Sequence, residues 1–263
     1  MSSSTTRPVA LITGVGRAAG IGAAIATRLA RDGWNVGTTA WAPYDDRMPW
    51  GRDRDPLGGV GGSADGPIER AIRAAGALTV TIAADLEDVT APAAIFDRTE
   101  AALGPVTALL LCHCESVDSS LRDTTVESFD RHMTVNARAS WLLIAEHARR
   151  YRAAEGAGRI VALTCDHTVG NLPYGASKGA LDRIVLAAAR ELADLRITAN
   201  VVNPGPVDTG WMTPEQLRSA AAVSPRGRVA LPTDTAALVA FLCSTDGGWI
   251  NGQLLWSDVG FHA

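Results

Sequence analysis

The chain has 263 residues, of which 47% are hydrophobic, and no linker-like composition divides it, so we expect a single domain spanning residues 1–263. Its formal net charge is −4 and its arginines are scattered, which excludes the basic surface of a nucleic-acid-binding protein. No stretch approaches the roughly eighteen apolar residues of a membrane span, so we expect neither nucleic acid nor a membrane as a partner.

Short apolar runs alternate with helical patterns along the chain, which predicts an α/β fold with a doubly wound parallel sheet of about seven strands. The expected strands are Val9–Thr13, Trp34–Thr39, Leu78–Ala83, Val106–Cys112, Arg159–Thr164, Ile197–Val202 and Gln253–Trp256. The expected helices cover residues 20–32, 67–76, 90–103, 125–153, 174–193 and 232–243. We expect residues 41–66 to form one long irregular loop, and loops of that length are either functional or disordered. The polar segment 1–7 is expected to be prone to disorder.

A glycine-rich turn follows the first expected strand and leads into a helix of small residues. It contains Gly14, Gly16, Gly20 and Gly22, with Arg17 between them. Glycines let the backbone approach a phosphate group, and the first turn of the next helix offers free amides. Such a turn is weak evidence alone, but its place at the first strand of an alternating chain makes a phosphate-binding site the favoured interpretation.

The four cysteines, Cys112, Cys114, Cys165 and Cys243, fit a reducing compartment without a disulfide framework. Together with the lack of an apolar signal segment, this predicts a cytoplasmic protein. Cys112 and Cys114 flank His113 in the manner of metal ligands. However, they follow an expected strand, in which the two sulfurs would face one side and the imidazole the other. Without a second ligand pair we expect no metal site.

Lys178 is the only lysine among the 24 Lys and Arg residues, and it lies four residues after Tyr174. On a helix, residues four apart share a face, so the phenol and the ammonium can address the same ligand. A free tyrosine has a pKa near ~10, and a cation a few ångströms away lowers it. For an isolated motif of this kind, a surface Tyr and Lys on an amphipathic helix would be the better interpretation.

Five motifs together favour a catalytic Tyr–Lys pair over a surface pair. They are Thr13-Gly14…Gly20-x-Gly22, Asp85 at the end of the third strand, Asn136 in Thr134-Val135-Asn136-Ala137, Tyr174-x-x-x-Lys178, and Asn203-Pro204-Gly205-Pro206-Val207-Asp208-Thr209. With these motifs in this order, the chain resembles the short-chain dehydrogenase/reductase family from Leu11 to Gly252, and within it the 3-oxoacyl-carrier-protein reductases. The resemblance implies a single-domain Rossmann fold.

The resemblance also implies a nicotinamide cofactor. Asp85 would lie near the adenine, Thr209 near the carboxamide, and Lys178 would hold the nicotinamide ribose. Two of these residues have a simpler alternative, because Asp85 could cap the next helix and Thr209 could be a turn residue. The implied cofactor contacts are Gly14, Gly16, Arg17, Gly20, Ile21, Gly22, Asp85, Leu86, Tyr174, Lys178, Pro204, Gly205, Val207 and Thr209.

The end of the second strand favours NADP(H) over NAD(H). NAD enzymes commonly place an acid there to hold the ribose 2′-hydroxyl, whereas this strand is followed by no acid before Asp45. Arg17 could meet a 2′-phosphate, as similarly placed basic residues do in NADP-dependent members of the family. The glycine turn is longer than usual, which resembles the enoyl-reductase branch, but that branch has a wider Tyr–Lys spacing.

In the family, the tyrosine protonates a carbonyl oxygen, the lysine lowers the tyrosine pKa, an asparagine holds a relay water and a serine polarises the carbonyl. Tyr174, Lys178 and Asn136 match this pattern. Cys165 stands where the serine is expected, and a thiol is a weak hydrogen-bond donor. We expect Cys165 to occupy the serine site, with Thr164 as the alternative hydroxyl donor.

The substrate side departs further from the family. Leu111-Cys112-His113-Cys114 replaces the usual Asn-Asn-Ala-Gly, and the segment from Cys165 to Tyr174 is shortened. We expect a lid over residues 209–229, and Asp166 could equally cap a turn. Candidate substrate-lining residues are His113, Glu115, Ser116, Asp166, His167, Trp211 and Met212.

These expectations favour an NADP(H)-dependent oxidoreductase acting on a ketone, an aldehyde or a secondary alcohol. Two alternatives remain open: a dehydratase, cyclase or epimerase of the same fold without net redox chemistry, and a catalytically weak NADP(H)-binding protein. Family members usually pair their long helices, here 125–153 and 174–193. The second carries an apolar stripe that predicts a homotetramer or homodimer, formed by Leu181, Ile184, Val185, Ala188 and Ala189.

Overall fold

The computed structural model describes residues 7–48, 65–154 and 156–262. Seven parallel strands form one sheet in the order β3-β2-β1-β4-β5-β6-β7, which confirms the predicted α/β Rossmann-type fold. The strands are β1 Val9–Thr13, β2 Asn35–Ala40, β3 Thr79–Ala83, β4 Val106–Leu111, β5 Arg159–Leu163, β6 Thr198–Asn203 and β7 Leu254–Trp256. Apart from Arg7, the segment expected to be disorder-prone lies outside the described residues.

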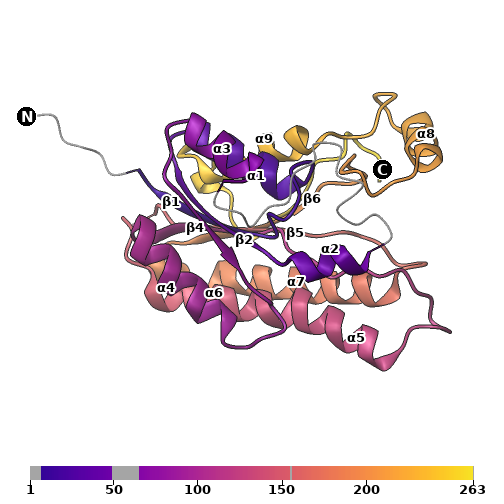
Figure 1. Ribbon diagram of the computed structural model, residues 1–263, viewed down its shortest axis with the longest axis horizontal. Coiled ribbons are helices and arrows are strands. Elements are labelled where there is room, and N and C mark those ends of the chain that lie inside the picture. The colour runs from indigo at the N-terminus through magenta and orange to yellow at the C-terminus, as the bar shows by residue number, and fades with distance from the viewer. Residues whose placement is uncertain (1–6, 49–64, 155, 263) are drawn as a thin grey trace, which may run out of the picture.

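Helices cover both faces of this sheet (Figure 1). One face carries α1 Ile21–Arg31, α3 Pro67–Ala74 and α9 Pro232–Cys243, and the other carries α4 Ala91–Leu103, α6 Ala139–Arg150 and α7 Leu172–Glu191. Two short 3₁₀ helices, η3 Ala193–Leu195 and η4 Asp246–Trp249, precede β6 and β7. Among the described ranges, we find no helix with both the length and the apolar character that a bilayer crossing requires.

The core has two layers because side chains alternate along each strand. Leu11 and Leu109 join the apolar cluster beneath α4, α6 and α7. Ile12 and Leu110, their neighbours in sequence, join the cluster beneath α1 and α9. Every residue of β1 and β4 is buried, as expected for central parallel strands covered on both faces.

The expected helix over 125–153 is interrupted. It consists of α5 Val126–His132, a π-helical turn η2 Met133–Arg138, and α6. The interruption centres on Asn136, whose amide donates to the Glu115 carbonyl at 2.9 Å and to the Ser177 hydroxyl at 2.8 Å. Local periodicity predicts a continuous helix here, whereas hydrogen bonds to two distant segments favour the wider turn.

Two helices lie in segments for which no helix was predicted. Within the predicted loop 41–66, residues Ala42–Arg47 form α2, and the rest of that prediction lies largely outside the described residues. Within the predicted lid, α8 spans Pro214–Val223 and begins with a capping box between Thr213 and Gln216. Pro at the first helical position and the capping box explain why α8 starts where it does.

The carboxyl ends of the parallel strands meet at one edge of the sheet, which positions the site. Directly after β1, β2, β4, β5 and β6 come Gly14, Trp41, Cys112, Thr164 and Pro204. In open α/β sheets this edge is where ligands bind.

Candidate active site

A cavity of about 460 Å³ opens at this edge of the sheet. It runs from the glycine turn after β1, past the ends of β4 and β5, to the N-terminal part of α7 and the segment before α8. Of the predicted site residues, those at its wall are Gly14, Gly16, Arg17, Gly20, Ile21, Gly22, Asp85, Leu86, His113, Glu115, Ser116, Thr164, Cys165, His167, Tyr174, Lys178, Pro204, Gly205, Val207, Thr209, Trp211 and Met212.

Two predicted site residues are absent from that wall. Asp166 is exposed to solvent and does not border the cavity, so its role as a substrate-lining residue stays a prediction. Asn136 is fully buried behind the cavity, where it accepts from the Glu115 amide at 2.7 Å in addition to the two hydrogen bonds it donates. Its amide therefore fixes the backbone at Glu115 rather than facing the open space.

The glycine turn is shaped by a close approach of two chain segments. Gly14 has φ +72°, and a Cβ there would lie 2.5 Å from the Cα of His113. Only glycine tolerates both constraints without strain. The turn consequently lies directly against the segment that follows β4.

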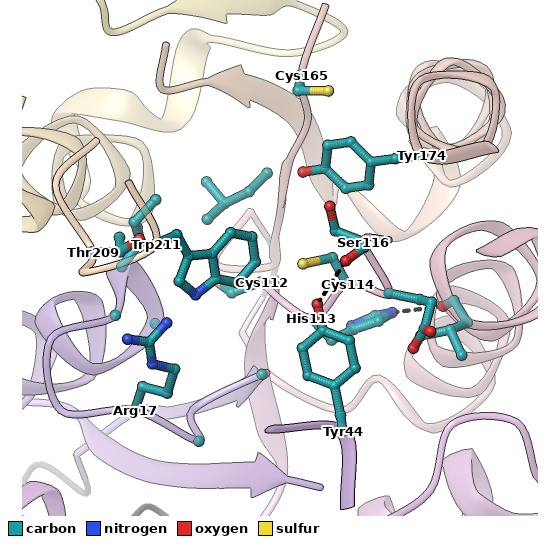
Figure 2. Close-up of a pocket in the computed structure, with 18 of the residues that line it drawn as sticks. Arg17, Tyr44, Cys112, His113, Cys114, Ser116, Cys165, Tyr174, Thr209 and Trp211 are labelled. Carbon is teal, nitrogen blue, oxygen red and sulfur yellow. Dashed lines mark hydrogen bonds between the residues drawn. The ribbon is translucent and has the colours of Figure 1, made fainter. Parts of the chain in front are cut away.

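Arg17 projects from this turn into the cavity (Figure 2). All three of its guanidinium nitrogens are buried and have no hydrogen-bond partner within the described part of the chain. A buried cation without a partner is costly, so its position indicates an anionic ligand.

The end of β2 carries no carboxylate at the cavity. Its wall there consists of Thr39, Ala40 and Trp41. On the neighbouring strand end, one oxygen of Asp85 accepts from the Glu87 amide at 2.9 Å, in a local turn of the kind expected for an aspartate that caps its own backbone.

Tyr174 and Lys178 lie on one face of α7, as predicted, but their electrostatics differ from the prediction. The Lys178 ammonium donates to the Leu163 carbonyl at 2.9 Å and lies 5.7 Å from the centroid of the Tyr174 ring. Burial raises the pKa of Tyr174 well above its ordinary value, so the expected lowering by Lys178 is not observed here. The phenol is enclosed, and the ammonium is directed to a backbone oxygen instead.

Cys165 and Thr164 take different directions after β5. Cys165 borders the cavity beside Tyr174, and burial raises the pKa of its thiol. The Thr164 hydroxyl is buried and lies beside the Asp182 carboxyl of α7 without reaching hydrogen-bond geometry. Cys165 therefore lies on the cavity side of this strand end, whereas the hydroxyl of Thr164 faces α7.

His113 borders the cavity, but its ring is engaged elsewhere. If Nε2 donates to the Val135 carbonyl at 3.0 Å, then Nδ1 accepts from the Thr13 hydroxyl at 2.6 Å. Burial lowers the pKa of His113 to about 3, which keeps the ring neutral. The imidazole thus joins β1 to the π turn η2, and it is not a proton donor for a ligand. Among the described residues, no cluster of ligating side chains is arranged to hold a metal ion.

The segment after β4 is held by α2, which sequence reasoning missed. Arg47 donates to both oxygens of the buried Glu115 carboxylate, at 3.3 and 3.0 Å. The Tyr44 hydroxyl donates to the Ser116 carbonyl at 3.4 Å (Figure 2). Both α2 side chains line the cavity. No pattern within residues 41–66 indicates these contacts, because their partners lie about seventy positions later in the chain.

The opposite wall comes from the expected lid. Trp211 projects into the cavity between the Arg17 side and the Tyr174 side (Figure 2). Met212, just before α8, and Gln216, in its first turn, complete this wall. The cavity therefore has a polar end at the glycine turn and a largely aromatic and sulfur-bearing end near Tyr174.

Known proteins resemble this chain in sequence and in architecture. A family model described as enoyl-(acyl carrier protein) reductase matches residues 61–262, and the uncharacterized oxidoreductase YjdA of Bacillus subtilis is 32% identical over 98% of this chain and 98% of its own. The chain belongs to the short-chain dehydrogenase/reductase family. Versicolorin reductase 1 of Aspergillus parasiticus is 33% identical, with 96% of this chain and 95% of that protein covered.

Among solved structures, the angucycline C-6 ketoreductase LanV with bound NADP superimposes with a TM-score of 0.80 at 28% identity, covering 97% of this chain and 95% of that one. This short-chain dehydrogenase/reductase is accordingly an NAD(P)-dependent reductase, as its sequence predicts.

Proposed function

We propose that the enzyme uses NADPH to reduce a ketone attached to an aromatic ring system, with Tyr174 as the proton donor. The observation that carries the proposal is the pairing of two features in one cavity. The buried, unpartnered guanidinium of Arg17 lies toward one end, and the enclosed phenol of Tyr174 lies at the other. NADPH bound here would supply a phosphate anion for the first and a hydride beside the second.

The cofactor choice rests on charge. Arg17 offers several N–H donors to a 2′-phosphate, and Thr39, Ala40 and Trp41 at the end of β2 bring no carboxylate that would repel it. The glycine turn and the N-terminus of α1 suit the pyrophosphate. LanV was solved with NADP bound, which agrees with this choice.

The proton chemistry favours reduction. A phenol whose pKa is raised by burial stays protonated at neutral pH, so Tyr174 is ready to give a proton. A carbonyl oxygen that gains an electron pair as hydride arrives becomes more basic than a phenolate, and it takes that proton. Lys178 lies on the same helical face and would bind the ribose hydroxyls, as the family resemblance implies.

The substrate class rests on the wall around Tyr174. Tyr44 and Trp211 offer flat aromatic faces and Met212 a polarisable thioether, and both kinds of surface suit a ring system. Trihydroxynaphthalene reductase PfmaI of Pestalotiopsis fici, 30% identical to this chain, is named for an aromatic ring system. An aliphatic ketone or an aldehyde would leave much of this wall without contact.

Location and assembly complete the proposal. Four free cysteines and the absence of a disulfide among the described residues support a cytoplasmic enzyme. One sheet takes strands from both ends of the chain, which supports a single domain. Trp211, Met212 and Gln216 line the cavity, which supports residues 209–229 as its lid. We further propose assembly into a homodimer or homotetramer.

Titrations of NADPH and NADH, combined with turnover of 1-tetralone and other aryl ketones, test this function. Arg17→Ala should weaken NADPH binding about 10- to 100-fold, the effect of a lost charge-assisted hydrogen bond, and leave NADH binding nearly unchanged. Arg28→Ala is the matched control, because Arg28 lies on α1 and pairs with Asp32 at the surface.

Tyr174→Phe should abolish ketone reduction while NADPH still binds with near wild-type affinity. Lys178→Met should impair both. A preference for NADH, or comparable turnover by Tyr174→Phe, would contradict the proposal. Product formation without cofactor consumption would instead support a dehydratase, cyclase or epimerase.

A further inference from the structure

The position after β5 that normally polarises the substrate carbonyl carries no strong hydrogen-bond donor in this enzyme. The Cys165 thiol is a weak hydrogen-bond donor, and the Thr164 hydroxyl faces Asp182 on α7. Yet negative charge that develops on a carbonyl oxygen requires a strong donor beside Tyr174. A hydroxyl that takes this role must face the phenol, and its proton must be free for the substrate.

Ser116 meets the first requirement. It follows β4, is 7% exposed and lines the cavity. Its hydroxyl is directed toward the Tyr174 phenol (Figure 2). The position is also firmly held, because the Tyr44 hydroxyl donates to the Ser116 carbonyl and Asn136 bonds both backbone groups of Glu115.

The hydrogen bonds around Asn171 meet the second requirement. Its side-chain nitrogen donates to the Asp118 carboxylate at 2.8 Å and to the Ser116 hydroxyl oxygen at 3.1 Å. The carboxylate offers only acceptors, so it fixes which end of the Asn171 amide faces both groups. Ser116 must then accept from Asn171, and its own proton stays free. Among the described residues, we find no hydrogen bond that this hydroxyl donates.

We propose that Ser116, rather than Cys165, donates the hydrogen bond that polarises the substrate carbonyl, an inference that rests on the carbonyl reduction proposed above. The carbonyl carbon receives the hydride of NADPH, and its π electron pair moves to the oxygen. That oxygen takes the proton of Tyr174, while Ser116 keeps its proton and stabilises the developing charge through the hydrogen bond. Asn171 and Asp118 are positioning residues: Asp118 orients the Asn171 amide, and Asn171 donates to the Ser116 oxygen, so the serine proton is directed to the substrate.

Kinetics of aryl-ketone reduction test the assignment. Ser116→Ala should lower kcat on the order of 10²–10³-fold, with NADPH affinity unchanged. Ser116→Thr, which keeps the hydroxyl, should restore part of the loss. Ser119→Ala is the matched control, because this serine lies three residues later and bonds to Thr124 outside the cavity wall. Thermal melting of each variant separates loss of the donor from loss of folding.

The Cys165→Ala variant tests the alternative that the thiol polarises the carbonyl. The proposal expects a smaller loss of turnover there than in Ser116→Ala. The reverse order would overturn it, as would an active Ser116→Ala enzyme.

Infrared spectroscopy of 1-tetralone, labelled at the carbonyl and bound together with NADP⁺, gives a readout without turnover. The carbonyl stretch should move to higher wavenumber in Ser116→Ala relative to wild type, because a donor has been lost. An unchanged stretch would overturn the role of Ser116 even if the enzyme reduces the ketone. If the wild type reduces no ketone but its bound carbonyl stretch still lies at lower wavenumber than that of Ser116→Ala, the proposed reaction fails and the assignment of the donor stands.

Discussion

His147 on α6 illustrates how a single buried residue can set the response of the whole fold to pH. Its ring packs between Phe96 and Tyr151, with ring centroids 6.0 and 5.6 Å away. Neither ring nitrogen has a hydrogen-bond partner within the described chain. Burial lowers the pKa of His147 to about 4, so the ring is neutral in the folded protein at neutral pH.

This burial predicts acid sensitivity. The unfolded chain binds a proton at its histidines near pH ~6.5, so the free energy of unfolding should fall as the pH drops from there toward 4. At pH 5 the loss attributable to His147 is about 2 kcal/mol. Urea unfolding of His147→Leu between pH 7 and pH 5 should show a shallower decline than wild type. The exposed His167 provides the control variant, His167→Leu, and parallel curves for wild type and His147→Leu would contradict the idea.

At the scale of elements, α2 shows how a short helix can shape the substrate end of the cavity. Its Arg47 is 39% exposed, but the Glu115 carboxylate to which it is bonded is only 3% exposed. Without Arg47 that carboxylate would remain buried without its cation. A buried group that loses its partner costs more than the pair itself contributes.

Arg47→Gln should therefore lower the free energy of unfolding by ~1–3 kcal/mol and raise the KM for ketone substrates, since Tyr44 and Arg47 both line the cavity. Arg28→Gln removes an exposed pair with Asp32 and should cost less than ~1 kcal/mol. Chemical denaturation and steady-state kinetics measure both effects. Equal stability losses in the two variants would show that Glu115 does not depend on α2.

The elements also show which predictions local patterns support. Most elements begin and end within one or two residues of their expected limits, namely the seven strands and α1, α3, α4, α7 and α9. Their apolar periodicity depends only on residues close together in the sequence. The π turn η2 and α2 were not foreseen. Each is stabilised by hydrogen bonds to a distant segment, which a local pattern does not contain.

At the scale of the whole molecule, the apolar stripe expected to pair subunits is used inside the subunit. Leu181, Val185, Ala188 and Ala189 are buried in the core beneath the sheet, so the argument that they face another chain is wrong. Some of the exposed apolar side chains lie at the β7 edge. Trp249 is 99% exposed and stands just before β7.

We predict that this edge contributes to subunit contact. Phe241 and Leu254 are 42% and 38% exposed in the neighbouring elements α9 and β7. Trp249→Ser should shift the assembly toward smaller species in light scattering at micromolar concentration, because a large apolar side chain would no longer be covered. Leu78→Ser is the control, since Leu78 is 62% exposed beside β3 at the opposite edge. A monomeric wild type would contradict the prediction.

The sequence by itself determined the layered α/β fold, the glycine turn and the spacing of Tyr174 and Lys178, because each depends on residues close together in the chain. Only the tertiary structure decided the hydrogen-bond partners, ion pairs and pKa shifts of the side chains at the cavity. The bond between Asn171 and Ser116 spans 55 positions, and that between Arg47 and Glu115 spans 68. Burial, which raises the pKa of Tyr174 and lowers that of His113, likewise arises only when the sheet and its two helical layers close around them.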